Sequence, residues 1–264
     1  MKIAFWSPYH GTGATANMLA LSVAISELFN KKVLVTQTHY NMNNLEKPLL
    51  GDVEDKESFF RDTGLDAIMR FFKSGNLTEE QVNNCSIKVS KNLYLLAGTR
   101  ASSRESYENK VVQDMVTHII TLVENFYDIV FVDTNSGNNE QSLKVISECD
   151  MVIATVRQGG DALEETINTP VLKDKKVFYL FGSYDPYSKY TLKNLRKMYK
   201  ELTKENTGGF PHCTQYMDAI ADNRILKYMN ANLEADEDHA DFEFFDSVRE
   251  VARLVSEMAI TKRR

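Results

Sequence analysis

Short runs of apolar residues recur along the chain, separated by longer segments in which apolar residues repeat at helical spacing. Most of these runs are apolar at consecutive positions, which is typical of strands buried on both faces of a parallel sheet. The pattern predicts strands at 2–6, 32–37, 92–97, 128–133, 151–156 and 176–181, and helices at 14–29, 64–73, 78–84, 108–126, 139–147, 160–168, 188–204 and 241–260. Strands that alternate with helices predict an α/β fold with three layers, built on a doubly wound and mostly parallel sheet.

Nothing in the sequence divides the chain into separate units. It has no internal repeat, no low-complexity tract and no linker rich in proline and glycine, and its length suits one domain spanning residues 1–264. In open α/β sheets, ligands bind beyond the carboxyl ends of the strands. The loops that follow the predicted strands are therefore where a functional site is expected.

The loop after the first predicted strand, SPYHGTGATANM at 7–18, has the glycines of a phosphate-binding loop without its charge. When the pattern G-x-x-x-x-G-K-[ST] is placed with its second glycine on Gly13, the lysine position falls on Ala14 and the hydroxyl position on Thr15. Glycines allow the backbone amides to turn inward, and the following helix adds the positive end of its dipole. The candidate nucleotide-binding residues are Tyr9, His10, Gly11, Thr12, Gly13, Ala14, Thr15 and Ala16. A tight turn from strand to helix needs glycine in many other folds, so the loop alone leaves both interpretations open.

A second set of polar residues follows the strand predicted at 128–133. The strand ends in Asp133 and continues into Thr134-Asn135-Ser136-Gly137. In P-loop proteins an aspartate at the end of a buried strand helps to hold Mg²⁺. An aspartate at this place can also cap a helix or turn the chain. Because Thr15 and Asp133 occur in the order that the P-loop pattern requires, we favour the metal interpretation and take both as candidate Mg²⁺ ligands.

Composition narrows the class of protein. The formal net charge of −6 gives no general electrostatic reason to bind nucleic acid, although a local basic patch would escape this count. Three widely spaced cysteines, an odd number, indicate buried free thiols in a reducing cytoplasm. The apolar start of the chain is too short for a signal peptide core, and no run reaches 18 apolar residues. We therefore expect a cytoplasmic protein, with the acidic stretch at 230–241 as a solvated loop or helix entry.

With these residues in place, the chain resembles the ParA/MinD family of P-loop ATPases with a deviant Walker A motif, and within it the TadZ/CpaE-like proteins of pilus assembly. The resemblance covers nearly the whole length. It is carried by SPYHGTGATANMLALSVA from residue 7, NLYLLAGTR at 92–100, YDIVFVDTNSG at 127–137 and Phe210-Pro211. It implies the fold of a P-loop NTPase, ATP or ADP with Mg²⁺ as cofactors, and a homodimer. It also implies protein partners in a system that positions or assembles a cellular machine, such as a pilus or a secretion apparatus.

Each departure from this family pattern removes a charged or polar side chain that the family uses at its nucleotide site. The lysine that reaches across the family's dimer falls on Tyr9, and the P-loop lysine falls on Ala14. The stretch that carries two aspartates in the family reads Gln37-Thr38-His39, and the adenine-reading asparagine is replaced near Gly182-Ser183. Because phosphoryl transfer depends on positioned charge, the sequence predicts a nucleotide-binding scaffold with weak or absent hydrolysis, a pseudo-ATPase without catalytic residues. An active ATPase with substitute cations, and an interaction module that no longer binds nucleotide, remain as alternatives.

Four residues could supply substitute positive charge. His10 lies in the loop and His39 follows the second strand, and either could titrate near neutral pH. Arg100 and Arg157 end strand segments at the expected binding edge, and a guanidinium binds phosphate bidentately. Histidines that bond only to loop backbone, and arginines that only cover the surface, would look the same in the sequence.

Two further features leave their interpretation open. Tyr9 could stack on a partner or on a base, or pack against Trp6 and Tyr40 as ordinary filling. The apolar spacing over 242–260 predicts a helix packed on the sheet, and the basic end at 261–264 is too small to anchor a membrane alone. At most, peripheral association with a membrane is expected.

Overall fold

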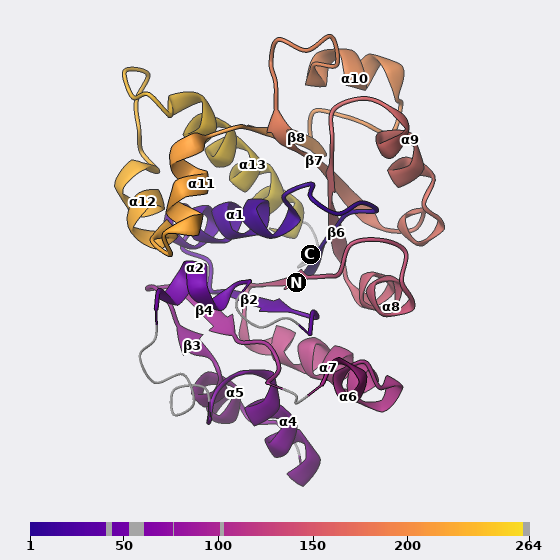
Figure 1. The fold of residues 1–264 in the computed structure, drawn as a ribbon, viewed down its shortest axis with the longest axis vertical. Helices are drawn as coiled ribbons and strands as arrows, with labels where there is room; N and C mark the ends of the chain where they lie inside the picture. Colours follow the sequence, from indigo (N-terminus) through magenta and orange to yellow (C-terminus); the bar gives the residue numbers. More distant parts are fainter. Residues whose placement is uncertain (41–43, 53–60, 76, 101–102, 261–264) are drawn as a thin grey trace.

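The computed structural model describes residues 1–40, 44–52, 61–75, 77–100 and 103–260, without the side chain of Ile260. These residues form one sheet of eight strands in the order β3-β4-β2-β5-β1-β6-β7-β8 (Figure 1). The strands are β1 Lys2–Trp6, β2 Val33–Gln37, β3 Ile87–Lys88, β4 Leu93–Leu96, β5 Ile129–Asp133, β6 Met151–Val156, β7 Lys176–Tyr184 and β8 Thr207–Pro211. Every neighbouring pair is parallel except β3 and β4, so the predicted α/β class with a mostly parallel sheet is confirmed.

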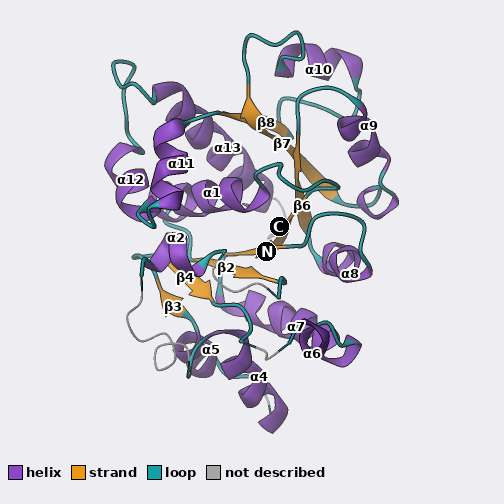
Figure 2. Cartoon of the chain, in the orientation of Figure 1, coloured by secondary structure: helices purple, strands orange, loops and turns teal. Residues whose placement is uncertain are grey.

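Helices cover both faces of this sheet and complete the three layers (Figure 2). One face carries α1, α2, α11, α12 and α13, and the other carries α4, α5, α7, α8, α9 and α10. The helices are α1 Ala14–Leu28, α2 Glu46–Leu50, α4 Gly64–Ser74, α5 Glu79–Cys85, α6 Arg104–Tyr107, α7 Lys110–Val123, α8 Glu140–Glu148, α9 Asp161–Asn168, α10 Leu192–Met198, α11 Thr214–Ala221, α12 Ile225–Asn232 and α13 Phe242–Ile260, with 3₁₀ turns η1 Glu124–Phe126 and η2 Pro170–Leu172.

Strand β1 shows why the apolar pattern predicts this fold. Its side chains alternate between the two faces, with Ile3 and Phe5 in one core cluster and Ala4 and Trp6 in the other, and all four are fully buried. Such a strand can hold its place only at the centre of a sheet covered on both sides. The centre of the sheet is where β1 lies, between β5 and β6.

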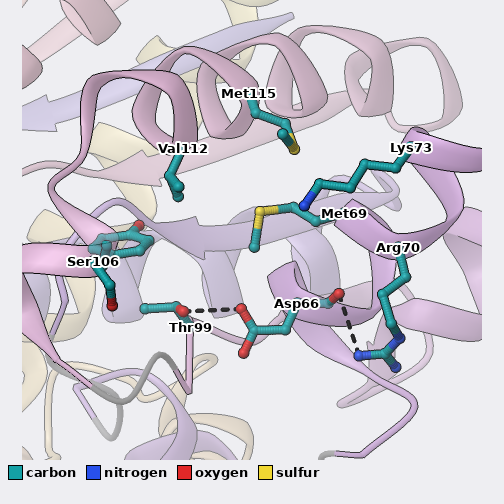
Figure 3. A pocket seen from close by; sticks show the side chains of 9 residues that line it. Asp66, Met69, Arg70, Lys73, Thr99, Ser106, Val112 and Met115 are labelled. Carbon is teal, nitrogen blue, oxygen red and sulfur yellow. Dashed lines mark hydrogen bonds between the residues drawn. The ribbon is translucent and has the colours of Figure 1, made fainter.

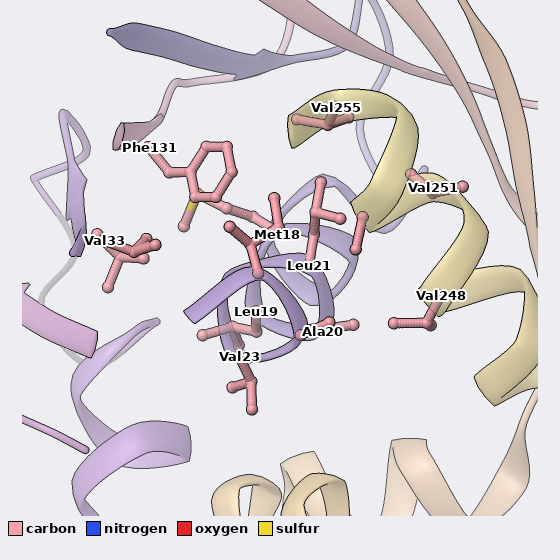
Figure 4. Close-up of a cluster of buried hydrophobic side chains, with 14 of the residues drawn as sticks. Met18, Leu19, Ala20, Leu21, Val23, Val33, Phe131, Val248, Val251 and Val255 are labelled. Atoms are coloured by element: carbon pink, nitrogen blue, oxygen red, sulfur yellow. The ribbon is translucent and has the colours of Figure 1, made fainter. Parts of the chain in front are cut away.

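Helix α1 is apolar on nearly all sides because it is enclosed on nearly all sides. Its residues Met18 and Leu21 lie near Phe131 of the sheet and near Val251 and Val255 of α13 (Figure 4). A helix that is hydrophobic all round is a buried helix. This packing fixes the start of α1, and with it the loop that precedes the helix.

The structure corrects several predicted boundaries. Strands β3 and β8 and helices α2, α6, α11 and α12 are additional to the prediction, and the helix predicted over 188–204 covers only Leu192–Met198. Strand β8 escaped the prediction because Gly208 has no side chain to show the pattern. A Cβ at Gly208 would lie 2.4 Å from Cγ2 of Val251, so α13 packs directly on this strand.

The C-terminal helix α13 packs on the sheet as predicted, through buried Phe245, Val248, Ala252 and Val255. The basic end at 261–264 lies outside the described residues. Within the part of the chain that the structure describes, no helix has both the length and the apolar character needed to cross a membrane.

Candidate functional site

The phosphate-binding candidate is the turn from β1 into α1. Gly11 and Gly13 adopt φ angles of 71° and 81°, a region that glycine occupies without steric cost. Gly13 is the N-cap of α1, no side chain caps the helix there, and its first turn has no acidic residue. The first amides of a helix have no partner within the helix, so those of α1 are available to an anion at its positive end.

Two glycines outside the loop hold it in place. Gly137, after β5, donates its N–H to the carbonyl of Ser7 at 2.8 Å and accepts from Nε1 of Trp6 at 2.9 Å. Gly182, in β7, lies so close that a Cβ there would be 2.6 Å from the carbonyl oxygen of Thr12. The backbone of the loop is therefore enclosed from two sides, by the turn after β5 and by β7.

The polar cluster beside the loop centres on Asp133, at the end of β5. The hydroxyl of Thr15 donates to Oδ2 of Asp133 at 2.7 Å, and Nε2 of His39 lies 3.1 Å from the same oxygen. The other ring nitrogen of His39 is 2.7 Å from Oδ1 of Asn135. Asp133 is fully buried, and its Oδ1 has no hydrogen-bond partner among the described residues. The structure thus brings together the two candidate metal ligands, Thr15 and Asp133.

His39 carries the clearest electrostatic consequence of this cluster. Burial by itself lowers the pKa of the imidazole, but the neighbouring carboxylate of Asp133, the amide oxygen of Asn135 and the charge of Glu46 outweigh it. The net effect raises the pKa above its ordinary value. The raised pKa favours the protonated imidazole, which would place a positive charge beside the carboxylate of Asp133.

A pocket of about 330 Å³ opens between the loop and this polar cluster. It is lined by Gly11, Thr12, Gly13, Ala14, Thr15, Ala16, Leu19, His39, Asn44, Asp133, Thr134, Ser136, Met217 and Ile220. Six of the eight predicted loop residues line it, and both candidate metal ligands do. The prediction from the sequence does not include Met217 and Ile220. Both belong to α11, a helix that the apolar pattern does not predict.

Tyr9 and His10 do not line this pocket, unlike the six other candidate residues of the loop. The hydroxyl of Tyr9 donates to Glu165 in α9, so Tyr9 does not fill the space beside Trp6 and Tyr40. His10 is exposed and borders a neighbouring pocket of about 550 Å³ with Arg104, Lys110, Lys144 and others.

The two candidate arginines lie at different pockets. A Cβ on Gly11 would lie 3.7 Å from Nη2 of Arg157, so this guanidinium is beside the loop. Arg100 follows β4 at another pocket, between α4 and α7, where its N–H donates to Asp66 at 2.6 Å. Figure 3 shows that pocket, with Thr99 bonded to Asp66. The guanidinium of Arg157 is therefore beside the loop, where it could assist a bound phosphate, whereas the backbone of Arg100 is bonded to Asp66.

The apolar side of the pocket is formed by Leu19, Met217 and Ile220. Helix α11 is tied to the loop, since the hydroxyl of Tyr216 donates to the carbonyl of Ala16 at 2.5 Å. Phe210 is buried against Phe244, with ring centroids 6.0 Å apart. A flat apolar group could bind against Met217 and Ile220 without a specific polar contact from them.

The site fits a nucleotide with Mg²⁺ on three observations. The amides at the start of α1 are uncapped, the buried Oδ1 of Asp133 lacks a partner among the described residues, and Gly182 leaves room for the loop. Carboxylate and hydroxyl oxygens are ligands that Mg²⁺ prefers. The fit lacks one usual element, since the position of the P-loop lysine is Ala14.

Neither a family model nor a curated protein matches the sequence. Solved structures do match. The septum site-determining protein MinD of Pyrococcus horikoshii, complexed with Mg-ADP, has a TM-score of 0.71 at 17% identity, over 98% of this chain and 96% of its own. A protein described as a plasmid partition protein, from Borrelia burgdorferi with bound AMPPNP, has a TM-score of 0.68 at 16% identity, over 97% and 98%.

The MinC:MinD cell division complex of Aquifex aeolicus also matches, with a TM-score of 0.67 at 13% identity, over 97% of this chain and 96% of the other. At identities this low, the likeness shows the fold alone. The chain therefore has the P-loop NTPase-like α/β fold of ParA and MinD ATPases.

Proposed function

We propose that this chain, acting as a single domain of residues 1–264, binds ATP or ADP with Mg²⁺ and serves as a scaffold with weak or absent hydrolysis. Its role would be to position or assemble a cellular machine such as a pilus or secretion apparatus, in the cytoplasm and as a homodimer. The single observation that carries the proposal is the pocket in which the uncapped start of α1 faces Thr15 and Asp133. Similar folds are seen with Mg-ADP, with AMPPNP and in a complex with a partner protein.

In this proposal, backbone and side chains have different tasks. The amides around Gly11 and Gly13 would hold the phosphates, and Thr15 and Asp133 would hold Mg²⁺ directly or through water. Bound Mg²⁺ would neutralise phosphate charge that the missing lysine does not. Met217 and Ile220 would contact the base through apolar groups alone. Such contacts would select little between purines and pyrimidines.

Weak hydrolysis follows from the charges that remain. Neither lysine of the family pattern is present, and His39 occupies the stretch where that pattern has aspartates. Removing a single strong donor to a transition state costs about 10²–10³ in rate. With two cations and a carboxylate absent, little turnover is expected from an otherwise intact binding site.

The test is calorimetry with ATP, first with Mg²⁺ and then with EDTA, on the unchanged chain and on Thr15→Ala. We expect binding that Mg²⁺ strengthens and that Thr15→Ala weakens mainly when Mg²⁺ is present. Ser74→Ala, which removes an exposed hydroxyl at the end of α4 and outside this pocket, serves as the control. Absence of heat and of any thermal shift at millimolar ATP would refute the proposal and leave the interaction module without nucleotide.

A second function is favoured by one observation. Arg157 lies beside Gly11 and has no hydrogen bond or ion pair among the described residues, so it could act as a substitute cation in an active ATPase. A phosphate-release assay separates the two functions. Turnover that disappears both in Arg157→Gln and in Asp133→Ala would establish the active enzyme and refute the pseudo-ATPase.

A further inference from the structure

The segment around α10 carries a strongly basic surface on an acidic protein. Between residues 189 and 204 there are six cations and one acid, whereas the whole chain has a net charge of −6. The five lysines of this segment are exposed, and none is within ion-pair distance of a described acid. We call them the lysine face: Lys189, Lys193, Lys197, Lys200 and Lys204.

The arginine of this segment makes hydrogen bonds that join α10 to the fold, whereas the described contacts of the lysine side chains amount to Nζ of Lys189 over the ring of Tyr190, 5.0 Å from its centroid. Arg196 donates from Nε to Oγ1 of Thr207 at 2.7 Å and from Nη2 to the carbonyl of Thr207 at 3.2 Å, which ties α10 to β8. Lys193 and Lys197 are one helical turn apart on the exposed side of α10, opposite buried Leu195. Like charges at this spacing repel each other, so the lysine face is unfavourable without an anionic partner.

Apolar groups accompany the lysines. Tyr187, in the loop before α10, is 92% exposed, and Met198 at the end of the helix is 57% exposed. Tyrosine and methionine are enriched at the centre of protein interfaces, and charged side chains such as lysine lie at the polar rim. The loop is also held firmly, since Gln158 donates to the carbonyls of Asp185 and Tyr190.

The same chain carries the complementary charge. The turn between α12 and α13 contains Glu234, Asp236, Glu237 and Asp238, all exposed, and we call residues 234–238 the acidic turn. Arg249 of α13 donates from Nη1 to the carbonyls of Leu233 and Ala235, each at 3.0 Å, which fixes the turn in place. No acid of this turn forms an ion pair among the described residues.

Both surfaces lie at the same end of the long axis of the molecule, with α10 on one side and the turn between α12 and α13 on the other (Figure 1). A twofold axis at this end would bring the lysine face of each protomer onto the acidic turn of its partner. An isologous interface forms both contacts at once from one pair of patches.

We propose that the lysine face binds the acidic turn of a second copy of this chain, forming a twofold dimer through the α10 end of the molecule. A short turn suits this surface better than a long polyanion. Glu201 and Glu205 interrupt the lysines, and the acidic helix α9, with exposed Glu164 and Glu165, shares a core cluster with α10. A duplex or an anionic bilayer would have to lie across these acids.

The pairing is expected to be weak and sensitive to salt, because exposed ion pairs contribute little and are screened. In sedimentation equilibrium without nucleotide, the mass should exceed the 30.1 kDa of one chain at low salt and return to it at about 0.5 M salt. A mass of one chain at every salt concentration would overturn the proposal.

Charge reversal gives a sharper test. Lys193→Glu/Lys197→Glu and Glu234→Lys/Glu237→Lys should each weaken self-association by about 10-fold or more, whereas Lys88→Glu/Lys91→Glu, at the far edge of the sheet, should not. An equimolar mixture of the first two variants should associate again, since every contact in the mixed dimer is complementary. Failure of the mixture to associate would overturn the proposal, provided that melting curves show both variants folded.

Two other outcomes would also overturn it. Loss of binding to duplex DNA, or to vesicles of anionic lipid, in Lys193→Gln/Lys197→Gln with unchanged self-association would assign the lysine face to that partner instead. Dimerisation through this end needs no nucleotide. Calorimetry with ATP therefore tests the proposed function separately, and either result leaves the other standing.

Discussion

The loop from Ser7 to Gly13 and the polar cluster around Asp133 lie on either side of one pocket but are built by different means. The loop offers backbone amides, positive φ at two glycines and a helix end, and no charged side chain from it lines the pocket. The cluster offers side chains, with Thr15 and His39 on one oxygen of a buried carboxylate. Backbone donors do not titrate and are lost only by substitution to proline, whereas the cluster depends on three side chains.

This difference separates anion binding, which the backbone could provide, from turnover, which would depend on side chains. Anion binding by amides needs only that the turn be held open, which Gly137 and Gly182 ensure. Metal binding and turnover need particular side chains. A chain that keeps the first and changes the second is expected to bind more readily than it hydrolyses.

Gly182→Ala should have the largest effect on nucleotide binding, because it acts on the backbone of the loop. The new Cβ would lie 2.6 Å from the carbonyl of Thr12 and 2.9 Å from Nδ2 of Asn17, and the first of these is main chain that cannot rotate away. Overpacking of this kind costs about 1–3 kcal/mol, or roughly 2–8 °C in Tm for a chain of this size. We expect loss of nucleotide binding together with this destabilisation, measured by calorimetry and thermal melting.

Gly98→Ala is the matched control for that change. Its Cβ would also meet an atom at 2.6 Å, but that atom is Nε2 of Gln37, the end of a side chain. A smaller loss of stability with nucleotide affinity retained is expected. Equal effects of the two substitutions would show that the loop is not specifically held by β7.

Asp133→Asn should disrupt the side-chain cluster and leave the backbone loop intact. The amide keeps the size of the carboxylate but removes the charge that faces Thr15 and His39. We expect nucleotide affinity in the presence of Mg²⁺ to fall by about 10–100-fold, with little change in EDTA. Equal losses with and without Mg²⁺ would place Asp133 in the support of the loop instead of in metal binding.

The sequence predicts some parts of the loop and of the side-chain cluster better than others. The apolar runs at 128–133 and 2–6 end where the structure ends β5 and β1, so Thr15 and Asp133 could be placed from the order of elements alone. The inward turn at Gly11 could also be predicted, because glycine spacing records the backbone conformation. Tyr9 and His10 could not be excluded from the pocket, since their direction depends on where that turn reverses.

The apolar side of the pocket could not be predicted, for a different reason. Helix α11 has only eight residues, and it follows the glycine-rich strand β8, in which two neighbouring positions have no side chain. Short elements give too few periods for an apolar pattern to be distinct. The contacts of Gly182 with Thr12 are equally invisible, because they join residues far apart in the sequence.

His39→Gln tests the cluster by pH. The pKa of His39 is raised in the folded protein, so its contact with Asp133 contributes fully below the ordinary pKa of about 6.5 and is lost as the pH rises through the folded-state value. The substitution should therefore cost about 1 kcal/mol near pH 5.5 and progressively less in alkaline buffer. Melting curves of both proteins from pH 5.5 to 9 measure this difference, and a constant or growing gap at high pH would contradict a charged His39 in the fold.

Arg157→Gln should give the smallest effect and decides whether the loop is assisted by a side chain at all. Arg157 is exposed, and its Nη2 is 3.7 Å from where a Cβ on Gly11 would lie, so water screens its charge. An exposed cation near a phosphate is worth about 0.3–1 kcal/mol, so ATP affinity should fall by about 2–5-fold, and less at high salt. The same calorimetry with Arg100→Gln should show no change, because Arg100 follows β4 beside Asp66. A loss of 100-fold in Arg157→Gln would mean that the missing lysine has been replaced, and the contrast between a backbone loop and a side-chain cluster would no longer hold.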